Sequence, residues 1–169
     1  MRYLALAGFI ATIFAANFAI TRLGVVSVGF GLMAPAGVYF AGVAFTLRDL
    51  LHDAGGRRWV LAAIIGGALL SALVEPRFAL ASGIAFGVSE TADWAIYEPI
   101  RRKGWLRAVA ASNAAGLTVD SMLFLWLAFG SLAFLPGQLI AKAYMTGVAI
   151  AIILVVRAIK AGRNPRVQI

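Results

Sequence analysis

The chain has 169 residues, of which 62% are hydrophobic and only 13% are charged. Soluble domains are about 45–50% apolar, so this composition predicts an all-α membrane protein with no room for a soluble domain. A net charge of +8 would suggest nucleic-acid binding in a soluble protein. Here the positive residues cluster at the ends of apolar segments, where membrane topology puts them, and no nucleic-acid partner is expected.

Cysteine is absent and His52 is the single histidine, which excludes disulfides, thiolate metal sites and histidine metal clusters. We therefore expect neither a metal nor a cofactor. At about 20 apolar residues per helical crossing, the length predicts one integral membrane domain over residues 1–169. It holds about six membrane-spanning helices with short connections.

The first expected helix covers residues 3–21, an uncharged stretch that is longer than the apolar region of a cleaved signal peptide. The second covers 30–51 and contains Pro35, where we expect a kink because proline removes a helical hydrogen bond. A polar turn leads to the third, 58–75, which is short.

The fourth expected helix, 78–98, follows the turn Glu75-Pro76-Arg77, since proline disfavours helical geometry in the residue before it. The fifth covers 105–134, which is long enough to be tilted or broken. The turn at Pro136-Gly137 leads into the sixth, 137–158.

With six spans, eleven basic residues fall on one side of the membrane, while Arg22 and Arg77 fall on the other. Because positive residues accumulate on the cytoplasmic side, both termini are expected there. The eleven are Arg2, Arg57, Arg58, Arg101, Arg102, Lys103, Arg107, Arg157, Lys160, Arg163 and Arg166.

Three acidic residues lie in the middle of apolar segments: Glu90, Asp93 and Asp120. A charge at membrane depth costs a few kcal/mol, so each must face a partner or water. Helical spacing gives two polar faces, one with Glu90, Asp93 and Tyr97, the other with Asn113, Gly116, Asp120 and Phe124. We expect these faces to converge on one ligand cavity between helices.

Structural alternatives stand beside this interpretation. Lys142 and one acid can form a simple buried pair, and Asp49 with Arg48 can form an interface pair near solvent. For Asp49 the two interpretations weigh equally, but for the three central acids we favour function, because one lysine cannot neutralise three carboxylates.

A more specific pattern runs through three helices. It reads S-E-x-x-D-x-x-I-Y at 89–97, W-L-R at 105–107 and S-N-x-x-G-L-x-x-D-S-x-x-F at 112–124, supported by Asn17, by F-T-L-R-D ending at Asp49, and by Lys142. From about Asn17 to Val156 the chain resembles the vitamin uptake transporter (VUT) family, whose better-known members are queuosine precursor transporters. The resemblance implies a multi-pass, six-helix protein of the bacterial inner membrane. It would take up 7-cyano-7-deazaguanine or 7-aminomethyl-7-deazaguanine.

For such a ligand we expect Glu90 or Asp120 to accept the N–H edge, because a carboxylate can accept two donors at once. Asn113 or Lys142 would donate to the ring carbonyl, and an aromatic side chain would cover the ring face. The candidate substrate-binding residues are Asn17, Glu90, Asp93, Trp94, Tyr97, Asn113, Asp120 and Lys142. The candidates for proton coupling are Asp93 and Asp49.

Two other functional classes stand beside the transporter. One is the substrate-binding membrane subunit of a vitamin importer driven by a partner ATPase, since the chain has no G-x-x-x-x-G-K-[ST] motif of its own. The other is an intramembrane hydrolase, which we do not expect because His52 lies in a polar turn far from Ser112 and Ser121. The energy source stays open, as does assembly into a homo-oligomer.

Overall fold

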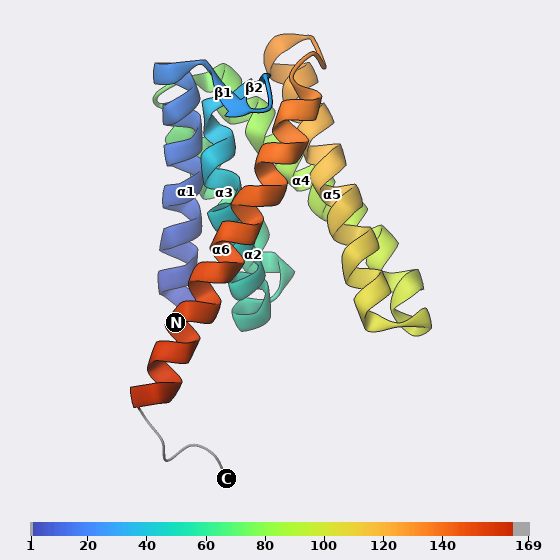
Figure 1. Cartoon of the computed structure of the whole chain (residues 1–169). Coiled ribbons are helices and arrows are strands. Elements are labelled where there is room, and N and C mark those ends of the chain that lie inside the picture. The colour runs from blue at the N-terminus through green and yellow to red at the C-terminus, as the bar shows by residue number, and fades with distance from the viewer. Residues whose placement is uncertain (1, 164–169) are drawn as a thin grey trace.

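The computed structural model describes residues 2–163, with side chains as far as Val155 except those of Trp105, Leu106, Val109, Ile150 and Ile153. Over this range the protein is all-α apart from one hairpin (Figure 1). Its helices are α1 (Arg2–Leu23), α2 (Ala41–Gly55), α3 (Arg57–Ala72), α4 (Pro76–Ile100), α5 (Trp105–Phe129) and α6 (Leu135–Arg163). Strands β1 (Val25–Gly29) and β2 (Leu32–Pro35) form the antiparallel hairpin, and 3-10 helices cover Ala36–Phe40 and Arg101–Lys103.

The helices run between two ends of the molecule, which we name for their turns. The hairpin end holds β1, β2 and the α5–α6 turn, at the top of Figure 1. The hinge end holds the start of α1, the α2–α3 turn at Gly56 and the 3-10 helix Arg101–Lys103.

The expected second helix, 30–51, is wrong in its first part. The chain makes a hairpin there because Gly29, Phe30 and Gly31 all take positive φ angles, of 93°, 55° and 72°, which a helix cannot contain. Pro35 ends β2 and precedes a 3-10 helix instead of kinking an α-helix. The α-helix begins only at Ala41 and continues past the expected end, to Gly55.

The expected fifth helix, 105–134, ends early. Gly130 takes the left-handed conformation, with φ of 66°, and its N–H bonds to the Trp126 carbonyl, which is a common helix stop. The fourth helix begins at Pro76 because Glu75 accepts a hydrogen bond from the N–H of Arg77, at 3.3 Å, and proline suits the first helical position.

Two contacts fix the elements that carry the site. A Cβ on Gly42 would collide with the Met145 carbonyl, so only glycine allows α2 to lie this close to α6. On the other side of α2, Ala44 and Leu51 pack into a buried cluster with Phe9 of α1. Helix α2 is therefore held between α1 and α6, with α4 and α5 packed on each other beside it.

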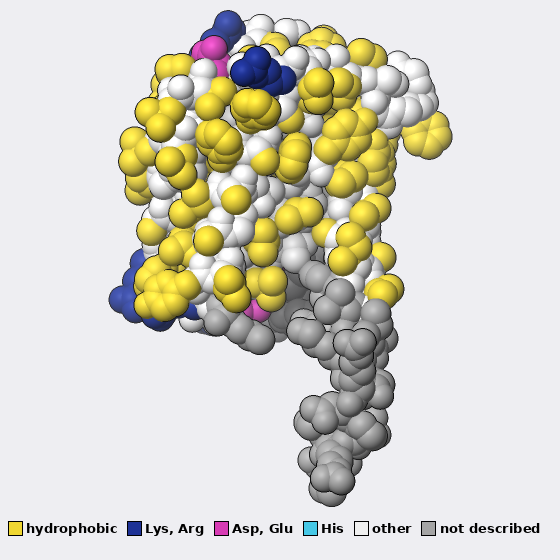
Figure 2. All heavy atoms as spheres, turned by 90° about the vertical axis from the view of Figure 1, so that its left-hand side faces the viewer, with side chains coloured by type: hydrophobic (Ala, Val, Ile, Leu, Met, Phe, Trp, Pro, Cys, Tyr) yellow, Lys and Arg dark blue, Asp and Glu magenta, His cyan; other side chains and the backbone are white. Residues whose placement is uncertain are grey.

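The surface is apolar around its middle. Figure 2 shows hydrophobic side chains over the described part of one face, with charged side chains gathered near its ends. Leu69, Leu80 and Leu154 are all at least 60% exposed, which would be unfavourable in water. Two of the described helices are long and apolar enough to cross a membrane, Arg2–Leu23 and the part of α5 from Ala110 to Phe129. These features support a membrane location.

Candidate functional site

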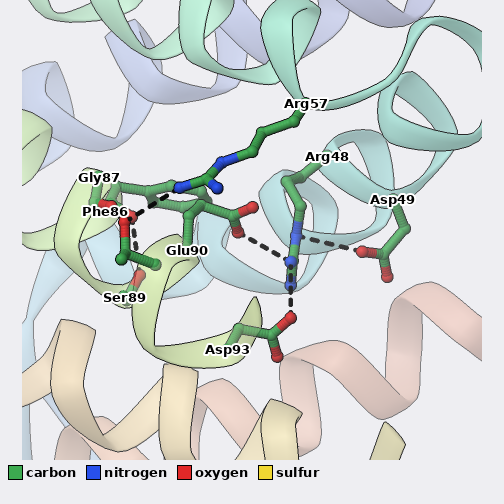
Figure 3. Close-up of polar contacts among 9 residues, drawn as sticks. Arg48, Asp49, Arg57, Phe86, Gly87, Ser89, Glu90 and Asp93 are labelled. Atoms are coloured by element: carbon green, nitrogen blue, oxygen red, sulfur yellow. Dashed lines mark hydrogen bonds and ion pairs between the residues drawn. The ribbon is translucent and has the colours of Figure 1, made fainter. Parts of the chain in front are cut away.

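The first polar group joins α2 to α4 and is called the Arg48 cluster: Arg48, Asp49, Glu90 and Asp93. Arg48 Nη1 lies 2.7 Å from Glu90 Oε1 and 3.8 Å from Asp93 Oδ2, and Arg48 Nε lies 3.1 Å from Asp49 Oδ1 (Figure 3). A guanidinium offers five N–H donors in one plane, so a single arginine can hold three carboxylates.

This cluster carries an excess of negative charge, because one guanidinium faces three carboxylates. Arg48 and Glu90 have side chains only 10% and 12% exposed, whereas that of Asp49 is 62% exposed. Asp93 Oδ1 is buried and has no hydrogen-bond partner among the described residues. Arg48 therefore makes a close, buried contact with Glu90 and a solvent-exposed contact with Asp49, and Asp93 has an oxygen that can accept a further hydrogen bond.

The second polar group, the Lys142 pair, joins α5 to α6. Lys142 Nζ forms an ion pair with Asp120 Oδ2 and donates a hydrogen bond to Ser121 Oγ at 2.9 Å. Lys142 and Asp120 are 4% and 8% exposed. Buried ion pairs bring little net stability, because desolvation offsets their attraction, so a pair of this kind is a candidate for function.

A central cavity adjoins the Lys142 pair, with about 630 Å³ of empty space including its mouth. Its walls come from α1, α2, α4, α5, α6 and the 3-10 helix after the hairpin. Four aromatic rings line it, Phe40, Phe45, Phe86 and Phe124, and its polar side chains include Asn17, Ser82, Asp120, Gln138 and Lys142. Apolar walls with a few polar groups are typical of small-molecule sites.

A second space, the vestibule, lies toward the hinge end and has about 1060 Å³ of empty space, including the open solvent at its mouth. It is lined by the Arg48 cluster together with His52, Asp53, Arg57, Trp94, Tyr97, Ser112 and Asn113. A smaller connecting hollow shares Phe45 with the central cavity and shares the Arg48 cluster with the vestibule. The three spaces therefore follow one another from the central cavity to the hinge end.

Phe45 stands where the central cavity meets the connecting hollow. Its ring stacks on Phe86 with centroids 5.7 Å apart. Arg48 Cζ lies 5.6 Å and Lys142 Nζ lies 5.9 Å from the centroid of the same ring. Phe45 therefore separates the two polar groups and contacts the cation of each, within the range of cation–π attraction.

The expected convergence of the two polar faces on one cavity holds only in part. Glu90 and Asp93 share the connecting hollow with Asn113 and Gly116 of α5. Asp120 instead lies in the central cavity with Lys142, on the other side of Phe45. The anticipated Lys142 pair and Arg48–Asp49 pair are both present. Beyond the expected pair with Asp49, Arg48 also holds Glu90 and Asp93.

The remaining predicted residues divide in the same way. Asn17 lines the central cavity, but its Nδ2 donates to Ile13 O and Ser71 Oγ, both at 3.2 Å, so its amide hydrogens tie α1 to α3. Trp94, Tyr97 and Asn113 line the vestibule. Trp94 is 53% exposed, with the Arg57 guanidinium 5.5 Å from its ring.

The sequence did not indicate the positions of Phe45 and Gln138 in these spaces, nor that Arg48 has partners beyond Asp49. The further partners of Arg48 could have been predicted, because acids buried in apolar helices need a cation and F-T-L-R-D places an arginine at the end of an apolar run. No sequence pattern marks Phe45 or Gln138, since a phenylalanine in an apolar helix and a glutamine after a turn are both common.

Comparison with known proteins gives one match. A family model described as "Putative vitamin uptake transporter" matches residues 72–161, just over half of the chain. The matched part contains Glu90, Asp93, Asp120 and Lys142. No curated protein and no solved structure matches the chain. The description of the family indicates transport and not catalysis.

Proposed function

The chain belongs to the vitamin uptake transporter family, and from that premise we propose that it imports a queuosine precursor. The substrate is 7-cyano-7-deazaguanine or 7-aminomethyl-7-deazaguanine, and the membrane is the bacterial inner membrane. All six helices then cross the bilayer, with both termini on the cytoplasmic side.

The observation that carries this proposal is that the central cavity has both aromatic walls and a buried ion pair. A deazaguanine is a flat ring with N–H donors and a carbonyl on one edge. Phenylalanine rings suit its faces, Asp120 suits an N–H donor, and Lys142 suits the carbonyl. We assign ligand binding to Asp120, because Asp120 lines the central cavity with Lys142 whereas Glu90 does not.

The distribution of basic residues supports the orientation. At the hinge end lie Arg2, Arg57, Arg58, Arg101, Arg102, Lys103 and Arg107, whereas Arg22 and Arg77 lie at the hairpin end. Positive residues accumulate on the cytoplasmic side. The vestibule then faces the cytoplasm, and the central cavity lies between it and the outside.

In this scheme the Arg48 cluster and Phe45 form the inner gate. The gate has two states, because the ion pairs of Arg48 to Glu90 and Asp93 must separate for a ligand to pass. A ligand that draws Lys142 away from Asp120 also disturbs Phe45, whose ring lies 5.9 Å from the ammonium. Asp93 and Asp49 are the groups proposed to take up a coupled proton once Arg48 is withdrawn.

The test measures uptake that restores queuosine in a host unable to make its own precursor, at matched protein levels. Asp120→Asn should abolish uptake, because it removes the charge that holds Lys142 and accepts the ligand. Glu90→Gln should reduce uptake without abolishing ligand binding, since Glu90 lies at the gate. Unchanged uptake in both variants would sink the proposal.

The same transport measured in liposomes containing the purified protein alone addresses the other class. Uptake without a partner supports an autonomous transporter. Binding without uptake supports a substrate-binding subunit that needs a partner ATPase.

A further inference from the structure

Gln138 is a buried amide with an unused acceptor. It lies in the first turn of α6, is 3% exposed and lines the central cavity. Its backbone N–H bonds to Phe134 O at 2.9 Å, but its side-chain Oε1 has no hydrogen-bond partner among the described residues. Buried polar atoms without a partner are rare in native proteins, so this one calls for an explanation.

The backbone under Gln138 is held firmly in place. A Cβ on Gly137 would collide with the Met33 carbonyl of β2, so the hairpin lies directly on this turn of α6. The amide therefore starts from a fixed backbone position, and relaxation of the helix end does not easily give it another partner.

Helical periodicity aligns Gln138 with the ion pair. Lys142 follows it by four residues, so both side chains lie on one face of α6, and both line the central cavity. Lys142 in turn holds Asp120 of α5. The cavity wall thus presents an amide, an ammonium and a carboxylate.

A primary amide has an acceptor oxygen beside an N–H₂ donor, and its complement is a group with an adjacent N–H and carbonyl. In a flat heterocycle that group is a lactam. We propose that Gln138 binds the lactam edge of the ligand, accepting its ring N–H at Oε1, and so determines which heterocycles are taken. This assignment rests on the proposed function and adds the residue that recognises the lactam edge of the ligand by hydrogen bonds.

The exocyclic amine of a deazaguanine is then left for Asp120. The ring carbonyl has two lone pairs, so it accepts from both Lys142 and Gln138 Nε2. An analogue methylated on the lactam nitrogen lacks the N–H and leaves the buried oxygen of Gln138 unpaired. Sites built to hydrogen-bond a ligand reject analogues that lack the matching group.

The test is ligand binding to the full-length protein in detergent, with 7-cyano-7-deazaguanine and its lactam N-methyl analogue as probes. Gln138→Leu should weaken binding of the parent compound at least about 10-fold, as expected for a lost hydrogen bond in a dry site. The wild type should also discriminate against the N-methyl analogue by at least about 10-fold. The leucine variant should lose that discrimination.

Thr46→Val is the matched control. Thr46 is not among the described residues that line the central cavity, and its hydroxyl donates to Gly42 O at 2.9 Å, so this variant should bind both compounds like the wild type. The melting temperature of each ligand-free variant shows whether a loss of binding comes from a lost ligand contact or from disturbed packing. Gln138→Leu should not lower it, because the substitution removes a buried unpaired atom.

Three results would overturn the assignment. Equal affinity of the wild type and Gln138→Leu for the parent compound would overturn it and leave the proposed function intact. A marked fall in the melting temperature of ligand-free Gln138→Leu would show that the amide serves packing. No binding of any deazapurine by the wild type would overturn the proposed function, and this assignment with it.

Discussion

The Arg48 cluster and the Lys142 pair are both ionic groups buried between helices, yet they differ in balance and access. The Lys142 pair is one cation with one anion, both nearly inaccessible. The Arg48 cluster is one cation with three anions, and it opens to the vestibule through the exposed Asp49. Under the proposed function this difference assigns the two groups different tasks: ligand binding to the Lys142 pair and control of passage to the Arg48 cluster.

The largest effect is expected from a substitution that breaks the Lys142 pair. Lys142→Met leaves Asp120 buried without a cation and should cost about 3–5 kcal/mol of stability. The double variant Lys142→Met with Asp120→Asn should recover most of that loss, because the buried charge is gone, but should not recover uptake. Thermal melting and uptake measure the two effects. Recovered uptake in the double variant would contradict a ligand-binding role for the pair.

Removing the cation of the Arg48 cluster comes next and should separate binding from transport. Arg48→Gln should lower uptake at least about 10-fold, within the usual range of coupling between sites. Ligand affinity in the central cavity should change less than about 3-fold, since Arg48 does not line it. Equilibrium binding and uptake on the same preparation check this. A parallel loss of affinity would remove the distinction between the two groups.

A smaller effect is expected at Phe45, which separates the spaces. Phe45→Leu keeps an apolar side chain but removes the ring that lies against both cations. A cation–π contact between buried groups is worth about 2 kcal/mol, but its loss falls on the free and the ligand-bound protein alike. We therefore expect binding within about 3-fold of the wild type, together with faster passive exchange of ligand across liposomes. Exchange no faster than in the wild type would show that Phe45 is not the barrier.

The smallest effect is expected at Asp49. Its side chain is 62% exposed, against 12% for Glu90 around the same arginine. Exposed ion pairs are worth about 0–1 kcal/mol, so Asp49→Asn should leave the melting temperature almost unchanged, while Glu90→Gln should lower it clearly. Equal losses in the two variants would show that exposure does not rank the partners of Arg48.

The sequence anticipated the helical fold and the polar residues, but not how they pair. Apolar runs with acids inside them predict helices and buried charge from composition alone. Which acid meets Arg48 and which meets Lys142 depends on how α2 lies against α4 and how α5 lies against α6, tertiary arrangements that no periodicity encodes. The hairpin was missed because a valine-rich strand before two glycines also fits an apolar helix on hydropathy alone.

The central claim is that ligand binds beside the Lys142 pair and not in the vestibule. Because the chain has no cysteine, Ser82→Cys in the central cavity and Asn113→Cys in the vestibule can each be labelled alone with a thiol reagent. Saturating 7-cyano-7-deazaguanine should slow labelling of the cysteine at position 82 and leave that at position 113 unaffected. Protection at position 113 alone would contradict the account.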